Sequence, residues 1–173
     1  MVRRIKKYNS ETNLQIQVAD YLRLQYPNVL FHSDYGSGIN LTIGQAVIQK
    51  RLNGGRRAWP DMFIAMGKAK PIPEGGFARS LERISLEWHG LMIEVKKDGT
   101  KLKRDKDCKK ILKGDTKIRK AGDWWDKHIE EQAETLEQLR KDGYKAEFAV
   151  GFEEAKKIID EYLGEEKNNE SIF

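Results

Sequence analysis

The stretch Leu91-Met92-Ile93-Glu94-Val95-Lys96 decides the fold of this chain, because two charges interrupt a short apolar run at alternate positions. Side chains alternate across a β-strand, so Glu94 and Lys96 share one face while the three aliphatic residues at odd positions share the other. A carboxylate and an ammonium group therefore project together from one side of the strand. We predict a strand over 91–96 that carries this pair.

The segments around this strand alternate between helical and extended patterns. Ser10 is typical of a helix N-cap, and Val18 and Leu22 fall on one stripe of the helix that follows it. Residues 62–66 form a short apolar run after Pro60-Asp61, as expected for a buried strand. The alternation predicts an α/β fold with a mixed sheet flanked by helices. We expect helices over 11–24, 41–52, 128–141 and 152–163, and strands over 29–31, 62–66, 91–96 and 146–150.

The length of 173 residues predicts a single domain over 1–173, with a polar and flexible tail from about 164. Two segments lie outside the regular alternation. Residues 67–89 contain two prolines and a Gly-Gly pair, which indicates a long excursion with a hairpin through 84–86. Residues 98–127 are rich in lysine, and we expect them to be partly helical.

The composition argues against several classes of protein. Charged residues make up 34% of the chain and the mean hydropathy is −0.72, and no apolar run approaches the roughly 20 residues that span a bilayer. The single cysteine, Cys108, offers neither a disulfide nor a zinc cluster. A phosphate-binding Gly-Lys-Ser/Thr loop is absent from the sequence, so no nucleotide cofactor is implied. We expect a cytoplasmic protein without a membrane-spanning segment.

The positive charge of the chain is concentrated in one segment. The net charge is +5 and the pI is about 9.2. Between residues 97 and 120 there are eleven Lys and Arg and four Asp, a net charge of +7, so the rest of the chain carries −2. This distribution is typical of a protein that meets a phosphate backbone on one side, although a charge run is also found on faces that contact only solvent.

The residue types near the predicted strands fit a metal site. If the strands over 62–66 and 91–96 pair, Asp61 and Glu94 converge on one ion, and Mg²⁺ prefers such oxygen ligands. The backbone carbonyl of Val95 is a candidate for a further ligand. A bound metal would polarise a phosphate and lower the pKa of a water, and Lys96 would orient that water or stabilise the transition state. The alternative is an ordinary cross-strand ion pair.

A wider set of motifs resembles a known family. Residues 54–61 (Gly-Gly-Arg-Arg-Ala-Trp-Pro-Asp), residues 90–96 and a glutamine, Gln132, eleven residues before Gly143-Tyr144 are similar to the VRR-NUC family. This is the virus-type replication-repair nuclease branch of the PD-(D/E)xK nucleases. The opening helix, with an acidic residue and a glutamine one turn later, and the Phe-Glu-Glu-Ala run at 152–155 fit the same pattern. The resemblance covers about 11–66, 90–97 and 128–163. The two remaining internal segments, 67–89 and 98–127, are insertions relative to compact members of the family.

The resemblance implies a restriction-endonuclease-like sheet with an α-β-β-β-α-β core. It implies that Asp61 and Glu94 bind Mg²⁺ or Mn²⁺ and that Lys96 is the catalytic lysine. Glu11 would reach the metal or its waters from the first helix, and Gln132 would complete the site. Each has a simpler reading as well, because Glu11 favours the helix dipole and Gln132 is able to hydrogen-bond a neighbouring backbone group.

Further residues are candidates for DNA contact. Arg56 and Arg57 precede the Pro-Asp corner, and their planar guanidinium groups suit phosphate oxygens. An equally good alternative is that both arginines lie on the surface and contact only solvent. Trp124-Trp125 is expected to pack the second insertion against the body, and the alternative is that one ring acts as a wedge at a DNA junction. His32 and Asp34, near the loop after the first strand, receive no assigned role. The remaining candidates for DNA binding are Gln15, Lys97, Lys101, Lys103 and Arg104.

The combined expectation is a metal-dependent DNA endonuclease. The resemblance implies a phage or prophage protein, a homodimer, that cuts branched DNA such as Holliday junctions during replication, recombination or repair. The same fold also serves sequence-specific restriction enzymes, and a non-catalytic DNA-binding module on a nuclease fold is a further alternative.

Overall fold

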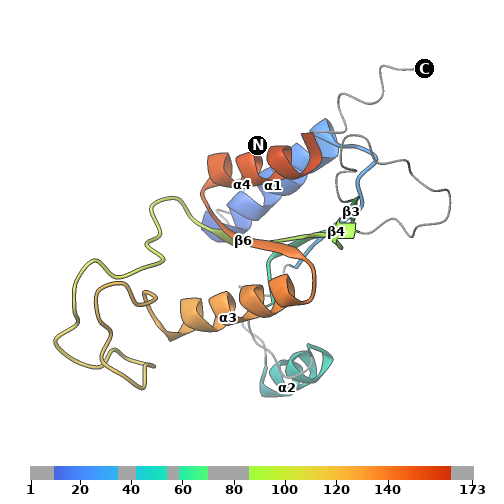
Figure 1. The fold of residues 1–173 in the computed structure, drawn as a ribbon. Coiled ribbons are helices and arrows are strands. Elements are labelled where there is room, and N and C mark those ends of the chain that lie inside the picture. The colour runs from blue at the N-terminus through green and yellow to red at the C-terminus, as the bar shows by residue number, and fades with distance from the viewer. Residues whose placement is uncertain (1–9, 35–41, 54–58, 70–85, 165–173) are drawn as a thin grey trace, which may run out of the picture.

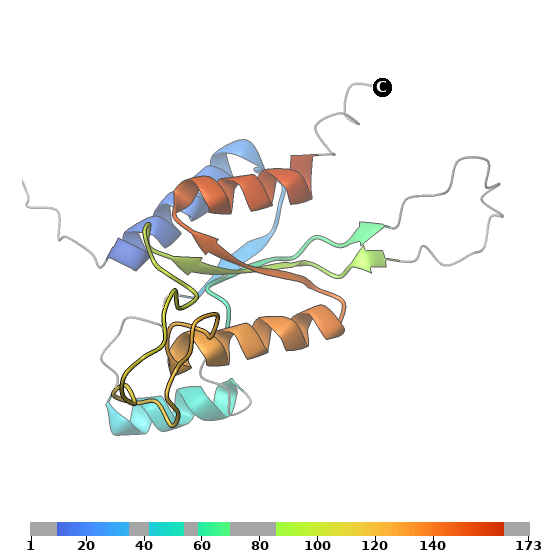
Figure 2. The same ribbon diagram turned by 60° about the vertical axis from the view of Figure 1, so that its left-hand side comes forward.

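A central β-sheet separates two layers of helices in the computed structural model, which describes residues 10–34, 42–53, 59–69 and 86–164 (Figure 1). The helices α1 and α4 cover one face of the sheet, and α3 covers the other (Figures 1 and 2). The elements are α1 (Ser10–Gln25), β1 (Phe31–Ser33), α2 (Ile43–Leu52), β2 (Met62–Ile64), β3 (Lys68–Ala69), β4 (Leu86–Trp88), β5 (Leu91–Lys96), α3 (Lys127–Lys141), β6 (Lys145–Val150) and α4 (Phe152–Leu163).

The four main strands follow the order β1-β2-β5-β6. The strands β1, β2 and β5 pair antiparallel, and β5 and β6 pair parallel, so the sheet is mixed as predicted. Every residue of the central strand β5 is buried. The pairing of β2 with β5 ends at Met62 opposite Ile93, while the pairing with β6 continues to Lys96 opposite Val150. The last residues of β5 therefore lie beside the residue that precedes β2.

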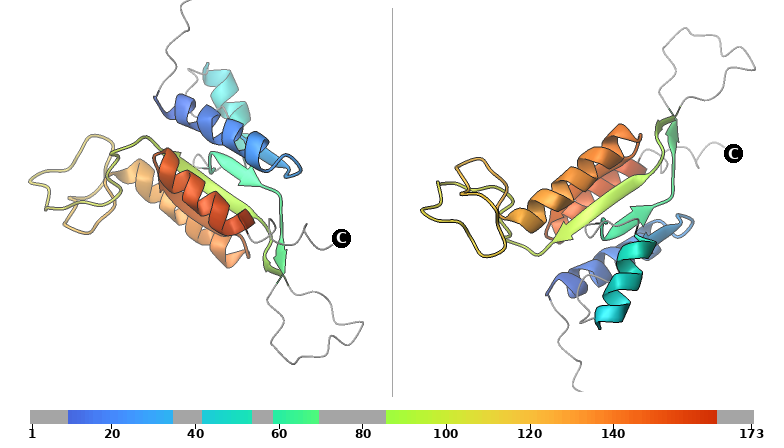
Figure 3. Two further views of the ribbon diagram at one scale, coloured as in Figure 1. Left: turned by 90° about the horizontal axis from the view of Figure 1, so that it is seen from above. Right: turned by 90° about the horizontal axis from the view of Figure 1, so that it is seen from below.

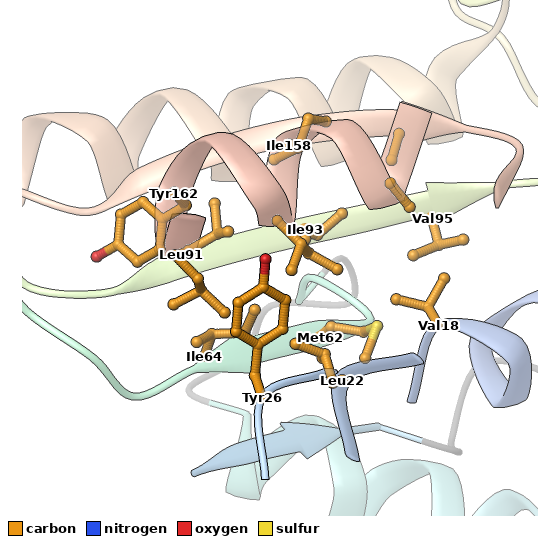
Figure 4. Packing of buried hydrophobic residues seen from close by; sticks show 14 of the residues in the cluster. Val18, Leu22, Tyr26, Met62, Ile64, Leu91, Ile93, Val95, Ile158 and Tyr162 are labelled. Atoms are coloured by element: carbon orange, nitrogen blue, oxygen red, sulfur yellow. The ribbon is translucent and has the colours of Figure 1, made fainter. Parts of the chain in front are cut away.

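The larger apolar core lies between the sheet and the helices α1 and α4 (Figure 4). The predicted stripe of α1 is confirmed, because Leu14, Val18 and Leu22 are buried there. From the sheet, the odd-numbered side chains of β5 enter the same core, as their alternation requires. The α4 helix adds a third set of buried residues: Ala155, Ile158, Ile159, Tyr162 and Leu163.

The opposite face of the sheet packs against α3 through a smaller cluster that contains Met92 of β5 and Leu136 and Leu139 of α3. The start of α3 is capped by Asp126, whose side chain accepts a hydrogen bond from the Ile129 N–H at 2.9 Å. At its other end Gly143 turns the chain into β6 with a φ of 87°, and a Cβ there would lie 2.5 Å from the His89 ring. Only glycine fits this turn without strain.

Several predicted elements differ from the structure in extent. The strand predicted over 29–31 lies at Phe31–Ser33, and β2 ends at Ile64 rather than residue 66. In the first insertion, β4 at Leu86–Trp88 pairs with β3, slightly beyond the hairpin predicted through 84–86, and residues 70–85 lie outside the described ranges. The prediction of partial helix in the second insertion is wrong, because residues 97–126 form turns and one isolated bridge, Lys103 to Trp124.

The basic insertion, residues 97–126, is tied to the body by charge and by an aromatic contact. The Arg119 side chain is 1% exposed and pairs with Asp115 within the insertion and with Glu130 of α3 at 2.8 Å. At its base the Trp124 ring lies 5.8 Å from the ring of Phe148 in β6, which confirms that tryptophan packs the insertion against the body. An ordered loop of this length without helix or strand therefore depends on a few specific contacts.

Among the described residues no helix combines the length and apolar character needed to cross a membrane.

The helices α1 and α4 are joined by a hydrogen-bonded carboxylate, Asp160. It accepts from the hydroxyls of Tyr21 at 2.5 Å and Tyr26 at 2.6 Å, and from Lys156 at 2.7 Å. Partial burial raises the pKa of Asp160, but the hydrogen bonds from Lys156 and the two tyrosines outweigh this and lower it to about 2. A pKa below the unfolded value of about 3.9 means that the ionised carboxylate stabilises the folded state.

We expect Asp160→Asn to lower the free energy of unfolding by about 1 kcal/mol at neutral pH, a value reduced for the partial exposure of the side chain. The difference from the unsubstituted protein is present above about pH 4 and disappears as the pH falls towards 2, because the native carboxylate is then protonated. Denaturant unfolding at several pH values measures it. Glu161→Gln, at an exposed position of the same helix, is the control, and an equal effect of both substitutions would contradict the assignment.

Candidate active site

Three charged residues of the predicted site lie on the α3 face of the sheet. Phe63 and Met92 pack on that face, and side chains alternate along a strand, so Asp61, Glu94 and Lys96 project to the same side. All three are buried, with exposed fractions of 6%, 2% and 7%. The sheet register therefore places one carboxylate from each of two neighbouring strands at the same end of the sheet.

The Asp61 carboxylate is held by the backbone of β5. Its Oδ2 accepts a hydrogen bond from the Val95 N–H at 2.8 Å, at the point where β2 no longer pairs with β5. The N–H and C=O of one strand residue face the same neighbour, so the Val95 carbonyl also faces the Asp61 side. The carbonyl of Asp61 accepts from the Asp34 N–H at 2.8 Å, which anchors the residue from the other direction.

The Glu94 carboxylate is held by two side chains. Its Oε1 accepts from Lys96 Nζ at 2.9 Å and from Nε2 of Gln132, which reaches down from α3. Gln132 is 5% exposed, and its Oε1 is buried and has no hydrogen-bond partner among the residues that the structure describes. A buried amide oxygen without a partner costs free energy, so its presence beside two carboxylates indicates a site arranged for a ligand rather than for stability.

Burial raises the pKa of both carboxyl groups. For Glu94, burial and the nearby charge of Asp61 raise the pKa to about 8, although Lys96 opposes the change. For Asp61, burial also raises the pKa, although the hydrogen bond from the Val95 N–H and the charge of Lys96 act to lower it. The single ammonium group therefore does not compensate for two buried carboxylates. A divalent cation would supply the missing positive charge.

The oxygen atoms of the candidate site are of the type that binds Mg²⁺ or Mn²⁺. Two carboxylates and one backbone carbonyl are hard oxygen ligands, and Mg²⁺ usually takes one or two protein carboxylates and keeps several waters. The described residues contain no cluster of three or more His, Cys, Asp or Glu side chains that could hold a metal ion. Glu11 is near enough for its charge to raise the pKa of Asp61 and Glu94, so a role through metal-bound water stays a prediction.

The other residues predicted to contact DNA differ in their exposure. Gln15 is buried on α1, with 6% of its surface exposed. Lys97 and Lys101 are exposed, and Lys101 pairs with Asp105. Arg104 donates from Nε to the Trp125 carbonyl at 2.8 Å, so much of its side chain holds the insertion together. Arg56 and Arg57 lie outside the described residues.

Two residues without an assigned role also have clear positions. His32 lies in β1 opposite Phe63 and is exposed, and Asp34 contributes its N–H to the Asp61 carbonyl. The buried ion cluster of Arg119 is not predicted from the sequence, in which Arg119 is one of the eleven basic residues between 97 and 120. The spacing of four residues between Asp115 and Arg119 was the available signal, but it does not indicate burial.

Comparisons with known proteins support the fold. The sequence matches no protein-family model and none of the curated proteins with which it was compared. Among solved structures it is similar to a VRR_NUC domain protein, with a TM-score of 0.51 and 21% sequence identity, over 91% of each chain. The chain has a VRR-NUC-like fold. The predicted restriction-endonuclease-like α/β architecture is confirmed, and in the VRR-NUC-like fold Asp61, Glu94, Lys96 and Gln132 meet at one end of the sheet.

We expect Mg²⁺ or Mn²⁺ at ten times its Kd to raise the melting temperature by about 3–6 °C, because the cation binds only the folded site. Asp61→Asn should abolish this shift. Without metal the variant should melt at an equal or higher temperature, because it removes a buried charge while Asn still accepts from Val95. Glu134→Gln, on the exposed side of α3, is the control. A full metal shift in the Asp61 variant would contradict the assignment of that ligand.

Proposed function

We propose that this protein is a metal-dependent endonuclease of the PD-(D/E)xK type that hydrolyses phosphodiester bonds in DNA. The supporting observation is the convergence of Asp61, Glu94, Lys96 and Gln132 at one end of the sheet. The solved structure with a similar fold is described as a VRR_NUC domain protein. The motifs shared with virus-type replication-repair nucleases favour a role in phage or prophage replication, recombination or repair.

The proposed mechanism assigns one task to each residue. Asp61, Glu94 and the Val95 carbonyl would hold Mg²⁺ or Mn²⁺, which polarises a phosphate and lowers the pKa of a bound water. Lys96, two residues beyond Glu94 on the same face, places an ammonium group where it orients the attacking water and balances charge on the phosphate. Gln132 donates to Glu94 and so fixes the direction of that carboxylate.

Exposed lysines beside this site support DNA as the substrate. Lys97 follows the catalytic strand directly, and the segment from 97 to 120 carries +7 of net charge. Each phosphate that such residues neutralise releases counterions, so binding should weaken steeply with salt. Arg56 and Arg57, two positions in the segment that precedes Asp61, remain candidates for the phosphates that flank the cut.

The cleavage experiment compares a four-way junction, a flap and a linear duplex of matched sequence, each with Mg²⁺, with EDTA and with the Asp61→Ala variant. We expect cutting of the branched substrates in Mg²⁺ only, and a loss of at least about 10³-fold in rate in the variant, because the metal supplies most of the stabilisation of charge.

The alternatives give different results in the same experiment. Cutting of linear duplex at fixed sequences would replace the branched substrate with a restriction-type specificity. Salt-sensitive binding of DNA by a folded protein without any cleavage would leave a non-catalytic DNA-binding module. Asp105→Asn, an exposed acidic position of the insertion, controls for a general effect of removing negative charge.

We further propose that the protein acts as a homodimer through α2. Figure 1 shows α2 below α3, on the side away from α1 and α4. Its aliphatic side chains are exposed as two pairs with a spacing of four residues: Ile43 (87%) with Val47 (54%), and Ile48 (58%) with Leu52 (81%). A helix of 10 residues is marginal in water without packing, so a partner surface is needed. A two-fold dimer would present two cutting sites to two DNA strands.

We expect a solution mass of about 40 kDa, twice the 20.0 kDa of the chain, by light scattering after size exclusion. Val47→Glu with Ile48→Glu should yield a folded monomer, because burying unpaired carboxylates in the contact is costly. Leu24→Glu, at a 76% exposed position of α1, should leave the dimer intact. A monomeric unsubstituted protein would exclude this role for α2.

A further inference from the structure

The basic insertion forms an arm that begins and ends at the candidate active site. It leaves the sheet directly after Lys96 and returns to α3 five residues before Gln132. Figures 1 and 3 show this arm, between β5 and α3, extending beyond the end of the sheet. A feature at the tip of the arm is therefore carried at a fixed place relative to the catalytic residues.

The tip of the arm, defined as the loop over residues 108–119, combines apolar and basic side chains. Ile111 is 52% exposed and Ile118 is 51% exposed. Both lie in a loop that is closed by a hydrogen bond of 2.7 Å from the Cys108 N–H to the Arg119 carbonyl. The exposed lysines of the same loop are Lys109, Lys110, Lys113 and Lys117, with Lys120 directly after it. Large aliphatic side chains among lysines are what DNA-distorting proteins insert between base steps while cations hold the phosphates.

The loop has the rigid support that such an insertion of side chains requires. Arg119 is buried at the neck of the loop, where it pairs with Asp115 on one side and with Glu130 of α3 on the other. Lys117 adds a second bond to Glu130, at 2.8 Å. The tip is therefore fastened to the same helix that carries Gln132.

The aromatic residues of the arm are already occupied. Lys103 Nζ lies 3.3 Å from the centre of the Trp124 ring, which also packs against the ring of Phe148. The Arg104 guanidinium lies 3.9 Å from the centre of the Trp125 ring. Each indole thus already has a cation over its ring, and among the described residues of the arm Ile111 and Ile118 are the large apolar side chains that are exposed.

We propose that Ile111 and Ile118 form a wedge that unstacks base pairs at the branch point of a DNA junction. The inference rests on the proposed nuclease function and identifies the side chains by which the nuclease would select branched DNA. Unstacking costs free energy, and the cost is lower at a branch, where stacking is already interrupted. The exposed lysines hold the phosphates of the arms on either side. The wedge thus favours branched DNA over linear duplex by shape rather than by sequence.

The test uses a four-way junction and a flap with 2-aminopurine at the branch, together with the same base inside a linear duplex. Binding is measured with the Asp61→Asn protein without added metal, so that the DNA stays intact. We expect saturating protein to increase 2-aminopurine fluorescence at the branch and not in the linear duplex. The Ile111→Ser, Ile118→Ser double variant should lose at least half of that increase, while the salt dependence of binding stays unchanged because the lysines remain.

The same double variant, with Asp61 restored, should lower the ratio of branched to linear cleavage by about tenfold. Leu24→Ser with Leu30→Ser removes two other aliphatic side chains, each 76% exposed and outside the arm, and should change neither the fluorescence nor the ratio. Because Ile111 and Ile118 are half-exposed, the variants should keep the melting temperature. Ile111→Thr, which conserves the branched shape, is used if the serine variant does not fold.

The outcomes separate this proposal from the proposed function. Absence of cleavage by the unsubstituted protein overturns the nuclease, while the fluorescence still reports on the wedge in the binding experiment. Unchanged fluorescence and an unchanged cleavage ratio in the double variant overturn the wedge and leave the nuclease in place. Isoleucine-dependent binding to vesicles of phosphatidylcholine and phosphatidylglycerol, without a fluorescence change on DNA, overturns the wedge and assigns the tip to a lipid surface.

Discussion

The hydrogen bond from the Val95 N–H to the Asp61 carboxylate is the constraint on which the candidate site depends. It forms where the pairing of β2 with β5 stops, so a side chain takes the place of the next backbone partner. This bond satisfies a backbone donor in a strand that is buried on both faces, and it fixes the carboxylate beside Glu94. The same contact therefore closes the sheet and builds the site, which links the stability of the central strand to the chemistry at its end.

The site retains groups that the fold alone does not need. Two buried carboxylates face one ammonium group, and burial raises the pKa of Glu94 to about 8. Within the described part of the chain, the buried side-chain oxygen of Gln132 has no hydrogen-bond partner. Buried polar groups that lack full compensation reduce stability, and proteins keep them mainly where function requires it. Two apolar cores, one on each face of the sheet, offset the loss of stability caused by these buried polar groups.

The sequence by itself predicted most of the helices and strands and the residues that converge in the candidate site. Alternation in 91–96 placed Glu94 and Lys96 on one face, and helical periodicity identified the buried stripe of α1, because these patterns depend only on local geometry. The motif around Asp61 and the position of Gln132 then indicated which residues would meet. The structure brings these residues together, as the spacing and the family resemblance predicted.

Tertiary structure alone decided the features that depend on contacts distant in sequence. The basic run predicted partial helix, yet a buried Arg119, paired with Glu130 eleven residues later, holds it as an irregular arm. The exposure of a side chain also cannot be read from its residue type. Ile43 in α2 is 87% exposed and Ile93 in β5 is buried, and this difference arises only from packing. Local sequence sets the conformations available to a segment, while burial and charge pairing depend on what the rest of the chain places against it.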